Sequence, residues 1–486
     1  MKYFKKIASL VLALALALVL AVPAMAANTY SITINNSATG HTYEAYQIFT
    51  GDLATNEAGN KVLSNIVWGS GISEAGKTAL GDAATKAETL KTEADAKAFA
   101  KEVAPYLTTA AGSANTVTDG KYVISGLAAG YYLVKDKDGS VTGEGDAYTE
   151  YIIKVVGNVT ADPKSDVPEV EKKVKDTNDS TGETSGWQDS ADYDIGDSVP
   201  FQLTATLADN VSAYTTYKIV FHDTLSAGLT YNNDAKVTFN GTDVTSYFTI
   251  TETNGTLTIT CDNVKAFSAT NSSVITVEYT ATLDDDAVLG SVGNPNEVYL
   301  EYSNNPNKSE AGNNETGNTP KDVVVVFSYK VIVNKVDGEG APLTGAEFTL
   351  EKYNKETGEW EAITAVKNDE GTTFTFSGLD DGKYRLKETT TPNGYNTIDD
   401  IYFTITATHD IEADNPALTG LSGDVTTGKI TFTASLPAGS LTTNVVNQSG
   451  ATLPETGGIG TTIFYVLGAV LVVGAGVVLV TKKRMG

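Results

Sequence analysis

Short runs in which apolar and polar residues alternate fill most of the chain from Val170 onward, and they restrict its fold more than any other feature. Period-2 alternation puts successive side chains on opposite faces of a β-strand. Turns rich in Gly, Asn and Asp separate the runs, so the pattern predicts β-sandwiches. The clearest runs are Phe201-Gln202-Leu203, Leu257-Thr258-Ile259, Val274-Ile275-Thr276-Val277, Phe348-Thr349-Leu350, Phe374-Thr375-Phe376 and Phe403-Thr404-Ile405.

The part of the chain before Val170 is mixed. Residues 74–107 carry Ala, Lys, Glu and Leu at helical spacing, between strand-like runs at residues 30–34 and 131–134. We therefore expect a mainly β chain of tandem immunoglobulin-like β-sandwich domains, with an α+β N-terminal domain that carries inserted helices. The pattern of residues 126–136, a Gly turn leading into a strand, returns at 378–388 and indicates that the first and last domains are related modules.

Two shifts in composition divide the chain. The first is the polar stretch 157–167, which contains Pro163, and the second is 303–322, which is dense in Asn, Gly, Pro and Ser and is typical of a long loop. Residues 323–327 suit a last strand of the preceding domain, so the second boundary is placed near Ser328. The expected segments are a signal peptide (1–26), an N-terminal domain (27–165), a middle sandwich (166–327), a C-terminal sandwich (328–450) and a sorting signal (451–486).

The N-terminal end has the pattern of an export signal. Lys2, Lys5 and Lys6 precede the apolar residues 7–22, and Ala24-Met25-Ala26 offers small residues to a signal peptidase. The pattern predicts a secretory signal peptide cleaved between Ala26 and Ala27. The alternative is an uncleaved run that acts as an N-terminal membrane helix.

The other end carries Leu453-Pro454-Glu455-Thr456-Gly457, then the apolar residues 459–480, then Lys482-Lys483-Arg484. Roughly 20 apolar residues span a bilayer, and the basic residues behind them stay on the cytoplasmic side. This order resembles the cell-wall sorting signal of Gram-positive surface proteins. The resemblance implies that a sortase cysteine cleaves between Thr456 and Gly457 and passes the threonyl group to an amine. The protein is then anchored to the cell wall after a transient membrane anchor. The alternative is an ordinary membrane anchor with a chance pentapeptide.

Charge and cysteine content limit the partners and the means of reinforcement. The net charge of −26 repels nucleic acid and anionic membranes, so neither is expected to bind. The single cysteine, Cys261, excludes an intramolecular disulfide. A secreted chain of this length must then be reinforced in another way or rely on its cores alone.

The C-terminal domain contains Tyr384-x-Leu386-x-Glu388-Thr389-x-x-Pro392-x-Gly394-Tyr395, opens with Tyr329-x-Val331-x-Val333-x-Lys335 and closes with Val445-x-Asn447. The first pattern resembles the E-box of Gram-positive pilins and of collagen-adhesin B-type domains. Alternation points Lys335 into the core, where an isolated charge is costly. The resemblance implies an intramolecular isopeptide bond between Lys335 and Asn447, with Glu388 as the catalytic acid.

Burial suits that chemistry. Desolvation lowers the pKa of a lysine, which must be neutral to attack a carboxamide, and it raises the pKa of a carboxylic acid. The protonated acid can then polarise the amide carbonyl and pass a proton to the leaving ammonia. The alternative is a buried ion pair of Lys335 with Glu388 beside a hydrogen-bonded Asn447.

The middle domain offers a second set of the same residue types. Val170-x-Lys172-x-Val174 opens it, Ile219-x-Phe221-x-Asp223 follows, and Asn296-x-Val298-x-Leu300 lies late in the domain. These patterns resemble the fimbrial isopeptide-forming middle domain, which implies a bond from Lys172 to Asn296 with Asp223 as the acid. Lys173 and Asn294 compete with them. Parity favours Lys172, because Lys173 faces solvent if Val170 and Val174 face inward.

The N-terminal domain departs from this pattern. Asp136 occupies the carboxylate position, but the opening strand at residues 30–34 has no lysine, so we expect no isopeptide bond there. The run from Gly40 to Gly51 looks like the start of a pilin N-terminal domain.

The chain resembles a major pilin, the shaft subunit of a sortase-assembled pilus. Such a subunit needs a lysine that accepts the threonyl group of another copy, and Asp162-Pro163-Lys164 stands where the family has an aromatic residue followed by Pro-Lys. Lys164 is therefore the expected acceptor, although Asp162 replaces the aromatic. A solvated linker lysine is the alternative, and Lys154 and Lys175 are weaker candidates. The implied partners are sortase, identical subunits in a head-to-tail polymer, peptidoglycan or a basal pilin, and host surface ligands.

Two other functions compete with the pilus subunit. A monomeric wall-anchored adhesin would use the same domains and sorting signal. A wall-anchored enzyme has less support, because the sequence carries no nucleophile–base constellation, so the chain is expected to be no enzyme beyond a single-turnover bond formation. No cofactor is expected, and the three histidines lack the spacing of a metal site.

Residues 71–78 match a P-loop, but no βαβ pattern surrounds them, so Gly76-Lys77 is expected in a turn that leads into a helix.

Overall fold

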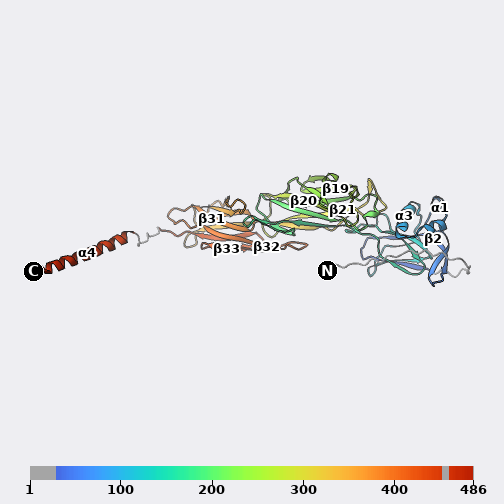
Figure 1. The fold of residues 1–486 in the computed structure, drawn as a ribbon, viewed down its shortest axis with the longest axis horizontal. Coiled ribbons are helices and arrows are strands. Elements are labelled where there is room, and N and C mark those ends of the chain that lie inside the picture. Colours follow the sequence, from blue (N-terminus) through green and yellow to red (C-terminus); the bar gives the residue numbers. More distant parts are fainter. Residues whose placement is uncertain (1–28, 451–458, 485–486) are drawn as a thin grey trace.

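The computed structural model describes residues 29–450 and 459–484, and its three β domains lie end to end in a row (Figure 1). Each domain pairs its alternating strands into two sheets that bury their apolar faces against each other. The predicted fold class, mainly β with tandem sandwiches and a mixed N-terminal domain, is confirmed. The predicted signal cleavage at Ala26–Ala27 and the pentapeptide Leu453 to Gly457 lie outside the described residues.

The N-terminal domain packs one sheet between a second sheet and three helices. One face carries Tyr43, Tyr132 and Val134 against Ile32 and Ile34 of the small sheet, and the other packs Phe49 on Phe99 of α3. The small sheet has the order β5 (Lys121–Leu127), β1 (Tyr30–Asn35), β8 (Val159–Ala161). The large sheet has the order β3 (Lys61–Trp68), β2 (Tyr43–Thr55), β6 (Gly130–Asp136), β7 (Glu150–Val155), with β4 (Gly112–Ala114) beside β2.

The helical segment predicted at 74–107 is divided into α1 (Glu74–Leu80), α2 (Ala83–Thr89) and α3 (Glu93–Val103). Ser73, Asp82 and Thr92 each accept a backbone N–H and start a new helix. Gly76 and Lys77 lie inside α1, so their expected place in a turn is wrong. The preceding strand β3 is antiparallel to β2, and the N–H of Gly71 donates to Gln47 O, so this segment lacks the setting of a phosphate loop.

The middle domain places its opening strand in one sheet and its late strands in the other. The first sheet has the order β17 (Thr242–Asp243), β16 (Lys236–Phe239), β20 (Val274–Leu283), β13 (Ser198–Thr206), β9 (Glu169–Val174), with β15 (Leu229–Tyr231) beside β20. The second has the order β12 (Ser190–Asp192), β25 (Asp322–Phe327), β21 (Asn294–Ser303), β14 (Ile219–Leu225), β19 (Thr256–Cys261), β18 (Thr249–Thr253).

The C-terminal domain pairs its first and last strands in parallel, so both of its ends belong to one sheet. That sheet has the order β29 (Val366–Lys367), β30 (Thr373–Leu379), β26 (Tyr329–Val336), β35 (Ser440–Val446), β34 (Thr433–Ser435). The facing sheet has the order β28 (Trp360–Ile363), β27 (Glu347–Tyr353), β31 (Gly382–Thr390), β32 (Ile401–His409), β33 (Leu418–Thr427).

The repeat found in the sequence is one structural unit used twice. Gly126 and Gly378 both have positive φ, and each lies just before a turn that leads from a strand of one sheet to a strand of the other sheet. In both copies a buried tyrosine hydroxyl closes the turn, since Tyr132 Oη donates to Ala128 O and Tyr384 Oη donates to Asp380 O.

The segment 303–322, expected as a long loop, is structured. It forms the short hairpin of β22 (Ser309–Glu310) and β23 (Asn313–Asn314), and β24 (Thr316–Asn318) pairs with β21. The backbone N–H groups of Gly145 and Tyr148, in the N-terminal domain, donate to Asn318 O and Asn304 O, so this segment also contacts the N-terminal domain. Beyond residue 458, α4 (Ile459–Arg484) is an apolar helix, and its residues Phe464–Lys483 are long and apolar enough to cross a membrane.

Candidate functional site

Lys172 and Asp223 meet in the core of the middle domain, each from a different sheet. Alternation along β9 turns Lys172 inward, where its side chain is 0 % exposed, and Lys172 Nζ lies 2.5 Å from Asp223 Oδ2. Aromatic rings line the lysine, with Nζ 5.1 Å from the ring centroid of Phe201 and 5.3 Å from that of Tyr279. The predicted lysine and acid are therefore brought together in an apolar surrounding.

Asn296 lies in the same buried group. The register of β14 and β21 pairs Asp223 with Val298 and Leu225 with Asn296, so Asp223 and Asn296 are diagonal neighbours on one face. Asn296 Nδ2 donates to Tyr279 Oη at 2.7 Å, and Tyr279 Oη also lies 3.0 Å from Lys172 Nζ. One tyrosine hydroxyl thus joins the predicted nucleophile to the predicted amide.

Burial sets the protonation of this group. It lowers the pKa of Lys172 and raises the pKa of Asp223, and the attraction between the two acts against both shifts. A neutral amine beside a neutral acid is favoured by such a dry site. Asp223 Oδ1 and Asn296 Oδ1 are both buried without a hydrogen-bond partner among the described residues. A proton on Asp223 Oδ1 would let the acid donate a hydrogen bond to Asn296 Oδ1 and would satisfy both atoms.

The competing neighbours have other contacts. The side chain of Lys173 is 24 % exposed and pairs with Asp189 at 2.5 Å on the outer face of β9. Asn294 is buried, but its amide donates to Val288 O and Val326 O, both at 3.1 Å, and fixes the backbone at the start of β21. The geometry therefore favours Lys172 and Asn296.

The C-terminal domain brings together Lys335, Asn447 and Glu388. Lys335 lies on β26 and Asn447 follows β35, and because these strands are parallel, the N–H of Asn447 donates to Val336 O, next to Lys335. Asn447 Nδ2 lies 2.8 Å from Glu388 Oε1 and 3.1 Å from Glu388 Oε2, which comes from β31 in the facing sheet. Lysine and asparagine are both fully buried.

Lys335 has no carboxylate within ion-pair distance among the described residues, and its Nζ donates to Val336 O and Val445 O. Burial lowers the pKa of Lys335 to about 8, although the charges of Glu388 and Asp337 act in the opposite direction. Asn447 Oδ1 is buried and has no partner in the described part of the chain. A pKa of about 8 leaves a fraction of the Lys335 amine neutral near pH 7, far more than for an ordinary lysine, and Glu388 holds the amide of Asn447.

In the N-terminal domain the acid at the repeat position contacts a histidine, His41, which follows the opening strand β1. Asp136, at the repeat position of Glu388, lies 2.8 Å from His41 Nδ1 and accepts the N–H of Thr149. A histidine ring cannot form the amide that the other two sets allow, so His41 and Asp136 stay a buried hydrogen-bonded pair.

Lys164 lies in the irregular segment between β8 and β9. Its backbone N–H donates to Thr149 Oγ1 at 2.6 Å, while its side chain is 51 % exposed and its Nζ lies 3.9 Å from Glu93 Oε1. Lys164 therefore has a fixed backbone and a solvated amine. An enzyme could reach this amine without unfolding a domain. Lys175 instead lies over Trp187, with Nζ 4.5 Å from the ring centroid.

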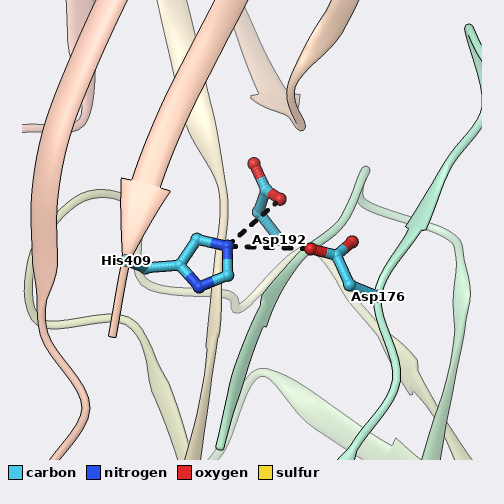
Figure 2. A group of neighbouring side chains, drawn as sticks. All are labelled: Asp176, Asp192 and His409. Atoms are coloured by element: carbon cyan, nitrogen blue, oxygen red, sulfur yellow. Dashed lines mark ion pairs between the residues drawn. The ribbon is translucent and has the colours of Figure 1, made fainter. Parts of the chain in front are cut away.

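Sequence reasoning missed the ion-pair cluster between the middle and C-terminal domains. Lys352 of β27 lies within 3.0 Å of Asp179 and 2.5 Å of Asp194, both from the middle domain, and 2.6 Å from Asp380 of its own domain. His409, at the end of β32, points between Asp176 and Asp192 of the middle domain (Figure 2). Its Nε2 lies 3.6 Å and 3.7 Å from them, and its Nδ1 lies 2.7 Å from Ser190 Oγ.

This junction should loosen as pH rises. Burial lowers the pKa of His409, but the nearby carboxylates of Asp176 and Asp192 outweigh it and raise the pKa from 6.5 to about 9. A raised pKa means that the stabilisation is complete below pH 6.5 and is lost as pH rises through about 9. Burial also raises the pKa of Asp381 to about 7, and Lys335 of the same sandwich has a pKa of about 8, so the contribution of the histidine is taken from the difference between the wild type and a variant at position 409.

We expect the free energy of unfolding of the C-terminal sandwich to fall by up to about 3 kcal/mol as pH rises from about 7 to about 9. The thermal midpoint should fall with it. In His409→Gln this dependence should become much weaker, while the control His222→Gln, which changes a histidine paired with Glu301 away from the junction, should keep it in full. An unchanged slope in His409→Gln would contradict the assignment. Calorimetry at several pH values measures both.

Comparisons with known proteins match three parts of the chain. Residues 195–306 match a Gram-positive pilin backbone subunit 2, Cna-B-like domain; residues 329–417 match a prealbumin-like fold domain; and residues 445–485 match an LPXTG cell wall anchor motif. The trypsin-resistant surface T6 protein of Streptococcus pyogenes serotype M6 is 25 % identical over 412 residues, which cover 71 % of this chain and 74 % of that protein.

Two solved structures share the fold. The T6 backbone pilin of serotype M6 Streptococcus pyogenes, described as a modular three-domain structure, aligns with a TM-score of 0.57 at 19 % identity, covering 88 % of this chain and 100 % of that one. The full-length major pilin SpaD of Corynebacterium diphtheriae aligns with a TM-score of 0.50 at 17 % identity, covering 87 % of this chain and 98 % of that one.

Proposed function

We propose that this chain, which is homologous to backbone pilins of sortase-assembled pili and carries an LPXTG cell wall anchor, is the repeating subunit of a covalent pilus shaft. As a sortase substrate it is joined through Thr456 to Lys164 of an identical subunit. The last subunit passes to peptidoglycan or to a basal pilin. Host surface ligands are candidate partners of the finished shaft.

The observation that carries the proposal is that a buried lysine and a buried asparagine lie together with a carboxylic acid in each of two successive sandwiches. In each set the neutral lysine Nζ attacks the side-chain carbonyl carbon of the asparagine. The C–N bond to lysine forms, the bond to Nδ2 breaks, one proton moves from Nζ to Nδ2, and ammonia leaves. The products are the bonds Lys172–Asn296 and Lys335–Asn447, each formed once, so the chain is no turnover enzyme.

The placement of these bonds suits a chain under tension. Lys172 lies on the opening strand of the middle domain, and Asn296 on β21 pairs with Val324 of the exit strand β25. Lys335 lies on the opening strand of the C-terminal domain, and Asn447 follows its last strand. A pull on the ends would therefore cross each sandwich through a covalent bond, and most strands would bear no load.

Lys164 suits the role of acceptor because its amine is solvated while its backbone is held. The sortase thioester on Thr456 is attacked by this amine, the thioester bond breaks, and an amide joins the two subunits. The name of the Streptococcus pyogenes relative says that it resists trypsin, and we expect the same of this chain. Its cross-linked sandwiches should rarely open far enough for cleavage.

Co-expression of the full chain with its cognate sortase tests the proposal. A shaft subunit should give a ladder of multimers that survives boiling in SDS. A single wall-anchored species with no ladder would instead support the alternative function, a monomeric surface adhesin with the same domains. Thr456→Ala is the control, because it removes the acyl donor and leaves the described domains unchanged.

A further inference from the structure

Tyr279 contacts all three members of the middle-domain set. It lies on β20, at one of the inward positions that alternate with exposed ones along this strand, and it is buried. Its hydroxyl accepts hydrogen bonds from Lys172 Nζ at 3.0 Å and from Asn296 Nδ2 at 2.7 Å, and it donates to Asp223 Oδ2 at 3.0 Å. The hydroxyl thus touches both the nitrogen that attacks and the nitrogen that leaves.

We propose that Tyr279 is a catalytic residue of the middle-domain cross-link, and that its hydroxyl carries a proton from Lys172 Nζ to Asn296 Nδ2. The inference rests on the proposed function, since it needs the Lys172–Asn296 bond to form. It adds a proton relay, distinct from the acid Asp223, that the sequence patterns did not include.

The contacts of Asp223 explain why a relay is needed. Among the described residues, its hydrogen bonds go to Lys172 and Tyr279, whereas the amide nitrogen of Asn296 bonds only to Tyr279. The path from the ammonium to the leaving nitrogen therefore runs through Tyr279 Oη. Burial and the nearby charge of Asp223 raise the pKa of Tyr279, so the hydroxyl keeps a proton at rest and can pass one on only as it receives another.

The proton balance is as follows. Lys172 first loses its extra proton to Asp223, 2.5 Å away, and becomes a neutral amine beside a neutral acid. Nζ then bonds to Cγ of Asn296, Cγ becomes tetrahedral, and the π pair of its carbonyl moves to Oδ1. The lone pair of Nδ2 is no longer conjugated and can accept a proton. Tyr279 gives its proton to Nδ2 and takes one from Nζ. The bond from Cγ to Nδ2 breaks, ammonia leaves, and the tyrosine ends as it began.

The C-terminal set provides an internal contrast. There, both carboxylate oxygens of Glu388 contact Asn447 Nδ2 directly, at 2.8 Å and 3.1 Å. Glu388 thus contacts the leaving nitrogen itself, and no relay residue stands between them. Loss of the tyrosine hydroxyl should therefore slow one bond and leave the other unaffected in the same molecule.

Tyr279→Phe in the full chain tests the relay. Peptide mass spectrometry after timed expression follows the fraction of each cross-link, and we expect formation of Lys172–Asn296 to slow by roughly 100-fold, the range of a lost general acid–base group. The Lys335–Asn447 bond should form at the wild-type rate, which also shows that the C-terminal sandwich folds. Tyr217→Phe is the matched control, because it removes a buried hydroxyl of the same sandwich that has no partner among the described residues.

The outcomes separate the relay from the proposed function. Formation of Lys172–Asn296 at the wild-type rate in Tyr279→Phe would overturn the relay and leave the cross-link intact. Absence of this bond in the wild type would overturn the proposed cross-link itself. If Tyr279→Phe folds poorly, 3,5-difluorotyrosine at position 279 keeps the shape and makes the phenol more acidic. A relay then shifts the pH profile of bond formation, and an unchanged profile overturns it.

Discussion

Lys164→Ala should abolish the SDS-resistant ladder that sortase produces from the wild-type chain, leaving only monomer attached to the wall. The reason is accessibility. Lys164 Nζ is solvated, its side chain is 51 % exposed, and its backbone is held by a hydrogen bond from its N–H to Thr149 Oγ1. An acyl-enzyme needs an amine that it can approach without unfolding a domain, and this segment between β8 and β9 offers one.

Two lysines near Lys164 supply matched controls. Lys154 lies on β7, and Lys175 follows β9 with its ammonium over the ring of Trp187, so each is tied to a domain. Lys154→Ala and Lys175→Ala should both keep the full ladder on an immunoblot of cell-wall extracts. A full ladder from Lys164→Ala, together with its loss in one of these variants, would contradict the assignment of the acceptor.

Asn296→Ala should lower the free energy of unfolding of the middle sandwich by about 5 kcal/mol, because the lost bond closes a loop of more than a hundred residues. This substitution removes the bond with less disturbance of the buried acid than a substitution of Lys172 would cause. It leaves Lys172 hydrogen-bonded to Asp223, whereas loss of the lysine leaves the buried acid without that partner. Denaturant unfolding and trypsin cleavage both measure the change, and the variant should be cut much faster than the wild type.

Asn294→Ala is the control for that result. Asn294 is also buried on β21, but it bonds backbone carbonyls of Val288 and Val326 and takes no part in the lysine set. Its loss should cost about 1–3 kcal/mol and should leave the release of ammonia unchanged. If Asn294→Ala lost the cross-link and Asn296→Ala kept it, the choice between the two asparagines would be wrong.

The position of the reactive lysines could be predicted from the sequence because strand alternation is strict. One residue decides whether a side chain faces the core, so Val170 and Val174 were enough to choose Lys172 over Lys173. The same argument placed Lys335. Tyr279 carried a signal that was missed, since it stands at an inward position among Ile275, Val277 and Ala281, where a hydroxyl needs a partner.

Other features depend on contacts between segments far apart in the chain. The pairing of Lys352 with Asp179 and Asp194 crosses a domain boundary, and no periodicity along one strand predicts it. The segment 303–322 has the composition of a loop, but its short strands are stabilised by β21 and by the N-terminal domain. Tertiary hydrogen bonds here outweigh local preference.

Mass spectrometry of the mature wild-type chain tests the central claim most directly. The two sandwiches should each have lost one ammonia, and proteolysis should release two branched peptide pairs, one joining Lys172 to Asn296 and one joining Lys335 to Asn447. An intact mass equal to that of the unmodified chain, with all four residues recovered in linear peptides, would contradict the account.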